Sequence, residues 1–210
     1  MSFLGDTSLD ESKLLDLARS MDEFEGYAPG QANRVAWVAD ALAEKFGLAR
    51  HDRDLLEQAA LLHDIGEVRM GRDYIRSGRE LSAHERLDLE RHPVIGEQAI
   101  AKLELAKSTQ LIVRWHHEWW NGNGYPDRLE AEQIPLSARI LRLADAYCSL
   151  TADRPWRKAM SDNDARRHLS EWAAIEFDPA VVMMFRQVRL PQAAEALHAD
   201  EAAPIFSSFR

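Results

Sequence analysis

The sequence contains one cysteine, no excess of positive charge and no long apolar run. Cys148 has no partner for an internal disulfide, which is typical of a reducing compartment, and we expect it to be a small core residue. No apolar stretch approaches the roughly 18 residues that a membrane-spanning helix needs. The first residues show no secretory signal. We therefore expect a cytoplasmic protein without a membrane span.

The 210 residues carry a formal net charge of -9. An acidic chain argues against a nucleic-acid polymer as partner, but it leaves room for a small anionic ligand held by arginines and metals. The length suits one main domain. We expect an N-terminal helical extension over residues 1–30, the main domain over 31–190 and a tail over 191–210.

Helical periodicity recurs along the whole chain, whereas alternating strand patterns are scarce, so we predict an all-α fold. Two apolar stripes indicate core positions, one through residues 14, 18 and 21 and one through 35, 39 and 42. Residues 68–81 are expected to form a loop. Helix starts are predicted from the capping residues Asp52, Ser82 with Glu85, Ser108, Pro135, Ser161 and Asp178.

The stretch LLHDIGE contains His63 and Asp64 at the end of an apolar helical run, which Gly66 is expected to stop. A neutral imidazole and a carboxylate are ligands for transition metals, and a carboxylate bridges two ions. The alternative is a helix end where His63 binds carbonyl groups and Asp64 faces solvent.

Further candidate ligands follow: His92 before Pro93 near a helix end, the pair His116 and His117, and Asp145 within the apolar run ILRLADAYCSL. Successive helical side chains point about 100° apart, so the histidine pair is alternatively a polar surface feature. A carboxylate in an apolar helix requires compensation, by a metal or by an arginine such as Arg142 or Arg139.

Taken together, LLHDIG, RHPVIGEQ, HHEWWNGNGYP and IPLSARILRLADAYCSLTADRPWRKA resemble the HD-GYP family of metal-dependent phosphohydrolases over about residues 30–188. The resemblance implies a helical HD-domain bundle with a metal centre in its core. It implies two divalent ions, iron or manganese, with nickel, cobalt or zinc as alternatives. It also implies hydrolysis of cyclic di-GMP by a metal-activated water, in bacterial signalling.

When the family motifs are matched to this sequence, the resemblance implies which residues are metal ligands, which are catalytic and which bind substrate. One metal position receives His63, Asp64, Asp145 and Gln31, and the other receives Asp64, His92, His116 and His117. Asp64 would be the bridge, and Asp64 with Glu67 falls at the catalytic positions. The substrate-binding positions are Gly122, Gly124, Tyr125, Pro126, Arg154 and Arg157.

The chain departs from the family pattern at three positions. Gln31 replaces a histidine, which weakens the first metal position. Tyr27 stands where some members carry a glutamate for a third ion, so we expect no trinuclear site. Glu67 replaces a lysine that would face substrate phosphate; two like charges about 4 Å apart repel by roughly 4 kcal/mol at an effective dielectric constant of 20.

Two functions remain open from the sequence. The first is a phosphodiesterase acting on cyclic di-GMP or another small phosphoester. The second is a degenerate relative that works as a ligand sensor or as a protein-interaction module, with a signalling protein bound through the loop around Tyr125.

Overall fold

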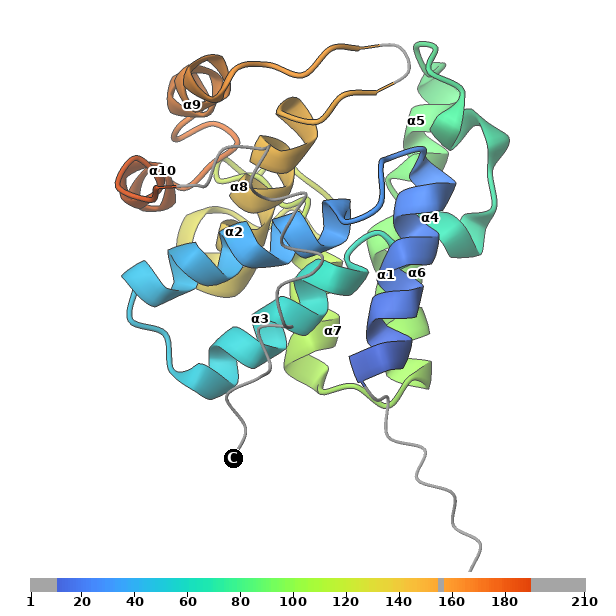
Figure 1. Cartoon of the computed structure of the whole chain (residues 1–210), viewed down its shortest axis with the longest axis horizontal. Helices are drawn as coiled ribbons and strands as arrows, with labels where there is room; N and C mark the ends of the chain where they lie inside the picture. The colour runs from blue at the N-terminus through green and yellow to red at the C-terminus, as the bar shows by residue number, and fades with distance from the viewer. Residues whose placement is uncertain (1–10, 155–156, 190–210) are drawn as a thin grey trace, which may run out of the picture.

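The computed structural model of the chain describes residues 11–154 and 157–189. Within these ranges the fold is built from helices, and the β-type pairings are isolated bridges, so the all-α prediction is confirmed (Figure 1). The predicted tail over residues 191–210 lies outside the described residues. The elements are α1 (Glu11–Glu25), α2 (Gln31–Lys45), α3 (Arg50–Leu62), α4 (Ile65–Met70), η1 (Asp73–Arg76), α5 (Ala83–Leu89), α6 (His92–Lys102), α7 (Lys107–Trp115), η2 (Ala131–Gln133), α8 (Leu136–Leu150), α9 (Asp162–Glu171) and α10 (Pro179–Phe185).

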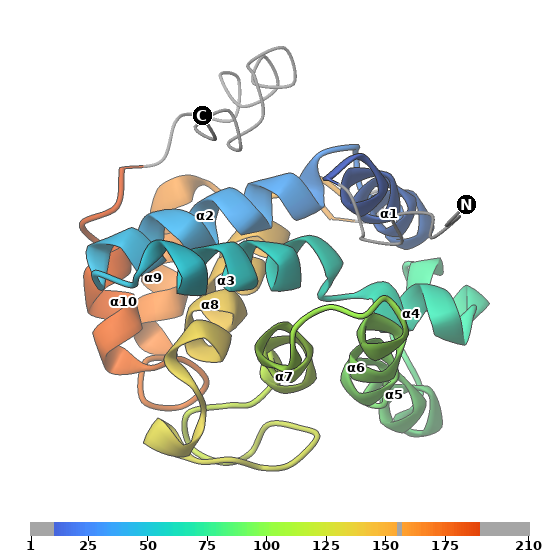
Figure 2. The same cartoon turned by 90° about the horizontal axis from the view of Figure 1, so that it is seen from below.

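The helices pack as two groups joined through α3 and α7 (Figure 2). In the first group, α2 packs against α3 and α8, and α9 and α10 lie beside α8. In the second, α6 packs against both α4 and α7. Helix α1 covers α2, α3 and α4. Helices α3 and α7 pack against each other and both also contact α8, so they link the two groups.

The predicted apolar stripes form part of the core. The side chains of Val35, Ala39 and Leu42 are fully buried, and the stripe of α1 is at most 5% exposed. Cys148 is buried, as predicted. This burial gives α1 and α2 fixed positions over the end of α3, because apolar side chains in a packed core leave little freedom to shift.

Several predicted helix starts are confirmed and two are wrong. Ser82 and Glu85 form the predicted capping box, and Ser161 and Asp178 cap α9 and α10. Helix α3 begins at Arg50, so Asp52 lies in its first turn. A carboxylate there interacts favourably with the helix dipole but does not cap the helix. Helix α7 begins at Lys107 after Ala106, not after Ser108.

Gly66 does not end the helix at the LLHDIGE stretch. Helix α3 ends at Leu62, and Gly66 lies inside α4, which also makes residues 65–70 helical where a loop was predicted from residue 68. A Cβ atom at Gly66 would lie 2.0 Å from the backbone oxygen of His92 and 2.9 Å from the backbone nitrogen of Gly96. Glycine is required here because the backbones of α4 and α6 touch.

The start of α2 is fixed by α1. The carboxylate of Asp22 accepts hydrogen bonds from the backbone N–H groups of Gly30, Gln31 and Ala32 at 2.9 to 3.0 Å. A side chain of α1 thus binds the unpaired N–H groups at the start of α2. As a result, Gln31 begins α2 directly beside the end of α1.

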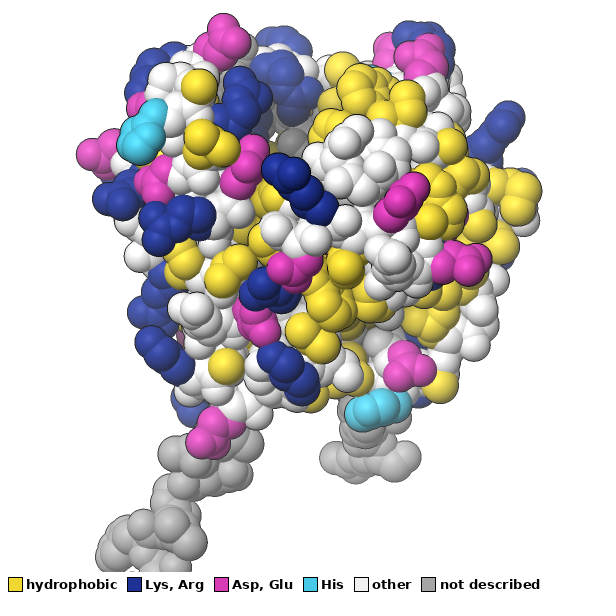
Figure 3. Space-filling view, turned by 180° about the vertical axis from the view of Figure 1, so that it is seen from behind, with side chains coloured by type: hydrophobic (Ala, Val, Ile, Leu, Met, Phe, Trp, Pro, Cys, Tyr) yellow, Lys and Arg dark blue, Asp and Glu magenta, His cyan; other side chains and the backbone are white. Residues whose placement is uncertain are grey.

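The surface carries mixed charge. Figure 3 shows Lys and Arg side chains gathered on part of one face, where they alternate with acidic side chains, and no uninterrupted basic surface appears on this face. Among the described residues, no helix combines the length and apolar character needed to cross a membrane.

Candidate metal centre

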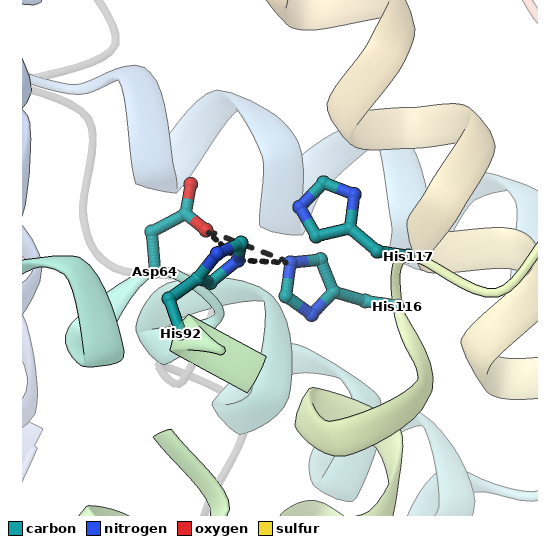
Figure 4. A group of neighbouring side chains, drawn as sticks. All are labelled: Asp64, His92, His116 and His117. Atoms are coloured by element: carbon teal, nitrogen blue, oxygen red, sulfur yellow. Dashed lines mark hydrogen bonds and ion pairs between the residues drawn. The ribbon is translucent and has the colours of Figure 1, made fainter. Parts of the chain in front are cut away.

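Six predicted ligands come from four parts of the chain that meet in the core. His63 and Asp64 lie between α3 and α4, and His92 is the first residue of α6. His116 and His117 follow the end of α7, and Asp145 lies within α8. In Figure 4 the side chains of Asp64, His92, His116 and His117 approach one another from these separate elements.

Three of the imidazoles are held in a defined tautomer. The Nδ1 atoms of His63, His92 and His116 lie 2.9, 2.8 and 2.6 Å from the backbone oxygens of the residues three positions earlier. A carbonyl oxygen only accepts, so each Nδ1 carries the hydrogen. In the neutral ring, Nε2 is then left with a free lone pair, which is the arrangement found in histidine metal ligands.

Those lone pairs converge on one carboxylate. The Nε2 atoms of His92 and His116 lie 3.2 and 3.5 Å from Asp64 Oδ1 and 3.4 Å from each other. Ligand atoms of Asp64, His92, His116 and His117 all lie within 4.8 Å of one another. A single proton bridges only two of these ligand atoms, whereas one divalent cation would be bound by all four.

The electrostatic environment fits a cation. Asp64 is 8% exposed, and its Oδ1 atom has no hydrogen-bond partner among the described residues. Burial opposes ionisation, but His63, helped by His116 and His92, holds the pKa of Asp64 well below its usual range. Burial lowers the pKa of His116, and burial with the neighbouring His116 lowers that of His117. Although burial works against it, Asp64 raises the pKa of His63 and of His92, so these two rings are favoured in the protonated form without a metal, and a bound cation would take the place of their protons.

A second group of donors lies on the other side of Asp64. His63 Nε2 is 3.0 Å from Asp64 Oδ2 and 3.7 Å from Asp145 Oδ1. These three residues line a small cavity of about 10 Å³ together with Gln31. The structure thus brings Gln31 beside the donors of the first predicted metal position, with Asp64 between the two groups.

Asp145 also has the arginine partner that was the alternative to a metal. Arg142 Nη1 lies 3.0 Å from Asp145 Oδ2, and Arg142 also pairs with Glu176. Arg139 instead binds Asp178. Because Oδ1 of Asp145 points toward His63 while Oδ2 faces Arg142, one carboxylate serves both neighbours.

The predicted substrate loop folds back over the histidines. Tyr125 donates its backbone N–H to the His117 oxygen at 3.1 Å, and its ring stacks on His117 with centroids 4.9 Å apart. Gly124 is needed for this approach, since a Cβ atom there would lie 2.2 Å from the Trp119 nitrogen. Gly122 has φ +77° and turns the chain just before.

Beyond Tyr125 lies a groove of about 390 Å³. Its walls come from α5, α6 and the loop after α7, and its lining combines apolar side chains with two arginines and one glutamate: Leu87, Glu90, Arg91, Val94, Ile95, Gln98, Tyr125, Pro126 and Arg128. Pro126 therefore faces this groove, whereas Tyr125 lies between the groove and the histidines.

The two predicted phosphate-binding arginines differ in position. Arg157 donates to the backbone oxygens of Ser149 and Leu150 at the end of α8. Arg154 lies over the ring of Tyr27, 3.4 Å from its centroid, and 3.8 Å from the Glu25 carboxylate beside the metal ligands. Only Arg154 is directed toward the candidate centre.

Glu67 lies on the metal-binding side of α4 and is 9% exposed. Burial and the nearby Asp64 carboxylate raise its pKa to about 7. Its side chain forms no hydrogen bond or ion pair with another described residue, whereas its backbone bonds to Asp64 and Gly71. The substitution of the family lysine therefore places an acid next to Asp64 rather than turning it to solvent.

Sequence reasoning missed two buried acids near the site. Glu25 is 7% exposed near Asp64 and Glu67, and Glu118 accepts hydrogen bonds from the backbone of residues 127–129 and so fixes the loop after Tyr125. A signal for Glu25 was present: the stripe through Leu14, Ala18 and Met21 continues, at helical spacing, to Glu25. An acid at a core position indicates a partner.

Comparisons with known proteins identify the family of the chain. The HD domain family model matches residues 17–181. A cyclic di-GMP phosphodiesterase of Vibrio cholerae is 38% identical over 157 residues, covering 71% of this chain and 32% of the relative. The chain spans about a third to a half of the length of the first curated relatives it matches.

Two solved structures share the fold. A cyclic GMP-AMP specific phosphodiesterase of V. cholerae, V-cGAP3, has a TM-score of 0.68 at 21% identity, with 94% of this chain and 51% of that one covered. Bd1817, an HDG"Y"P protein from Bdellovibrio bacteriovorus, has a TM-score of 0.61 at 22% identity, with 75% and 50% covered. At these identities the likeness establishes the fold.

Proposed function

Because the chain belongs to the HD domain family, with relatives of the HD-GYP type, we propose that it is a metal-dependent phosphodiesterase that hydrolyses cyclic dinucleotides. Cyclic di-GMP is the first candidate substrate, since it is the one named for the V. cholerae relative. A reaction that consumes a small anion suits the acidic chain, and its single buried cysteine supports a cytoplasmic location.

One observation carries the proposal: the Nε2 lone pairs of His92 and His116 face each other and the buried Asp64 Oδ1 atom. Acceptors at such distances repel unless a cation lies between them. Each ring is held by a carbonyl oxygen, so neither can turn away without losing a hydrogen bond. The site is thus preorganised for an ion.

We propose two divalent ions, iron or manganese, with Asp64 between them. When bound, such ions polarise a phosphodiester oxygen and lower the pKa of a water molecule. The nitrogen-rich position would be held by Asp64, His92, His116 and His117, and the second by His63, Asp64, Asp145 and Gln31.

The surrounding side chains suit a nucleotide substrate. The groove beyond Tyr125 offers apolar walls from Leu87 and Ile95 for a base, and Arg91 and Arg128 for polar or anionic groups. Arg154 is the arginine nearest to the second metal position and is the better candidate for binding phosphate. Arg157 acts on α8, where it holds the carbonyl groups that end the helix.

Glu67 limits the reaction by its charge. A carboxylate near the ligands repels a phosphodiester, but burial and Asp64 raise its pKa to about 7 in the metal-free protein, so a neutral form exists near neutral pH before ions bind. In that form Glu67 donates a hydrogen bond instead of repelling. We propose that Glu67 exchanges a proton during the reaction and that turnover is slow when it is ionised.

Gln31 and Glu67 also favour a second candidate function, a degenerate relative that binds ligand without hydrolysis. The two functions separate in one experiment. Metal-loaded wild type, His116→Ala and the matched control His51→Ala, whose exposed histidine lies on α3, are incubated with cyclic di-GMP and with cyclic GMP-AMP. Chromatography should show linear or mononucleotide product with wild type and His51→Ala, and none with His116→Ala. Binding without product in all three favours the sensor.

A further inference from the structure

The cavity at the junction of α1, α2 and α3 is separate from the histidine-rich side of Asp64. Its volume of about 10 Å³ holds the centre of one ion or water molecule and excludes a base or phosphate. Its polar walls include Glu25, Gln31, His63, Asp64 and Asp145. Glu25 comes from the last turn of α1 and matches none of the ligands expected from the family motif.

The polar side chains that line this cavity differ in how many hydrogen bonds and ion pairs they already make within the protein. Asp22 uses both of its oxygens on the backbone of α2, and the Tyr27 hydroxyl bonds to Ser149. His63 Nε2 has only Asp64 and Asp145 oxygens near it, with Nδ1 committed to a carbonyl group. Asp145 uses Oδ2 on Arg142 and keeps Oδ1 on the His63 side, and the Glu25 carboxylate is 3.8 Å from Arg154. Four oxygen-bearing groups and one imidazole thus line one small space.

The charge around the cavity is strongly negative. Glu25, Asp64 and Glu67 are all less than a tenth exposed, and Asp145 adds a fourth carboxylate. Arg154 supplies one positive charge here: it lies 3.8 Å from the Glu25 carboxylate and donates a hydrogen bond to the Glu25 backbone oxygen at 3.1 Å, which leaves four carboxylates around one such cation. Such a group of buried acids is stabilised by a cation.

We propose that Glu25 is a metal ligand and that it makes the second position oxygen-rich and selective for a hard ion such as Mn²⁺ or Mg²⁺. The inference rests on the proposed function for the presence of a two-metal centre. Carboxylate and amide oxygens suit Mn²⁺ and Mg²⁺, whereas imidazoles suit iron, zinc and nickel. Glu25 adds an anionic oxygen donor where Gln31, a weaker donor than the histidine it replaces, would otherwise leave the position short of affinity, and the two positions therefore prefer different metals.

The test uses metal binding rather than turnover. Full-length protein is stripped with a chelator, given one equivalent of Zn²⁺ to fill the histidine-rich position, and titrated with Mn²⁺ while free Mn²⁺ is followed by electron paramagnetic resonance. Wild type should bind one Mn²⁺ per chain. Glu25→Gln should weaken this binding by at least about tenfold while retaining zinc. Glu23→Gln, an exposed acid on the same helix, is the matched control and should bind as wild type does.

Equal Mn²⁺ affinity in Glu25→Gln and Glu23→Gln would overturn the proposal, as would a wild type that binds no Mn²⁺ after one equivalent of zinc. Gln31→His supplies an independent arm if Glu25→Gln does not fold. It adds a nitrogen donor and should shift the second position from Mn²⁺ toward a second Zn²⁺; an unchanged preference contradicts an oxygen-rich site. If Mn²⁺ binding depends on Glu25 but the protein hydrolyses no cyclic dinucleotide, this inference is supported while the proposed function is refuted.

Discussion

Replacing Gly66 with alanine tests whether the contact between α4 and α6 positions the metal ligands. The added Cβ atom would lie 2.0 Å from the His92 backbone oxygen, about 1.4 Å closer than ordinary van der Waals contact at 3.4 Å. Alanine favours a helix over glycine by about 1 kcal/mol, but overpacking costs roughly 1–3 kcal/mol or more when backbone must move. We therefore expect net destabilisation and a displaced His92. Metal–nitrogen bonds of about 2.0 to 2.3 Å do not tolerate such a shift.

The assay combines thermal unfolding with metal analysis. Gly66→Ala should lose ions from the histidine-rich position and unfold several degrees below wild type, at roughly 2–4 °C per kcal/mol for a chain of this size. Gly96→Ala is the matched control on α6, because its Cβ meets the Val113 side chain at 3.1 Å, and a side chain yields more easily than backbone. If Gly66→Ala keeps its metal and has the same unfolding temperature as Gly96→Ala, the backbone contact does not position His92.

Three further predictions concern the acids and the departures from the family pattern. Glu67 binds a proton more tightly in the folded state, because its pKa is raised there to about 7. Between about pH 4.5 and pH 7, the free energy of unfolding of metal-free wild type should therefore fall with rising pH relative to that of Glu67→Gln, by about 3 kcal/mol at most. Chemical denaturation at several pH values measures this, and parallel pH profiles for the two proteins would refute it. Glu118→Ala should destabilise the fold by about 1–3 kcal/mol, because three backbone N–H groups lose their acceptor; an unchanged denaturation midpoint would contradict that role. Gln31→His combined with Glu67→Lys should raise kcat/KM for cyclic di-GMP by more than the product of the single effects, since both serve one bound phosphodiester; multiplicative or smaller gains would show that the two positions act independently.

The candidate ligands were predictable because their side chains are unusual for their surroundings. Asp145 in an apolar helix and His63 with Asp64 at the end of another need compensation, and the structure brings them together. Periodicity located the core for the same physical reason, since the apolar face of a helix must be buried. The all-α fold followed from these patterns.

The parts that failed depend on tertiary contact. Gly66 was predicted to end a helix from its local propensity, but α6 lies against α4 there and a glycine is needed inside the helix. Asp52 and Ser108 are good capping residues by type, yet the helices begin earlier, where packing rather than a side-chain cap sets the start. Glu25 was overlooked because only the packing of α1 on α3 and α4 brings it to Asp64.

The central claim, that Asp64 and the histidines hold a metal, is tested most directly by anomalous X-ray diffraction from crystals grown with Mn²⁺ or Fe²⁺. The account predicts an anomalous peak bonded to Asp64 Oδ1 and to Nε2 of His92 and His116, at about 2.0 to 2.3 Å from the nitrogens. A map measured at saturating metal with no peak in this cluster, and with His92 Nε2 and His116 Nε2 remaining 3.4 Å apart, would contradict it.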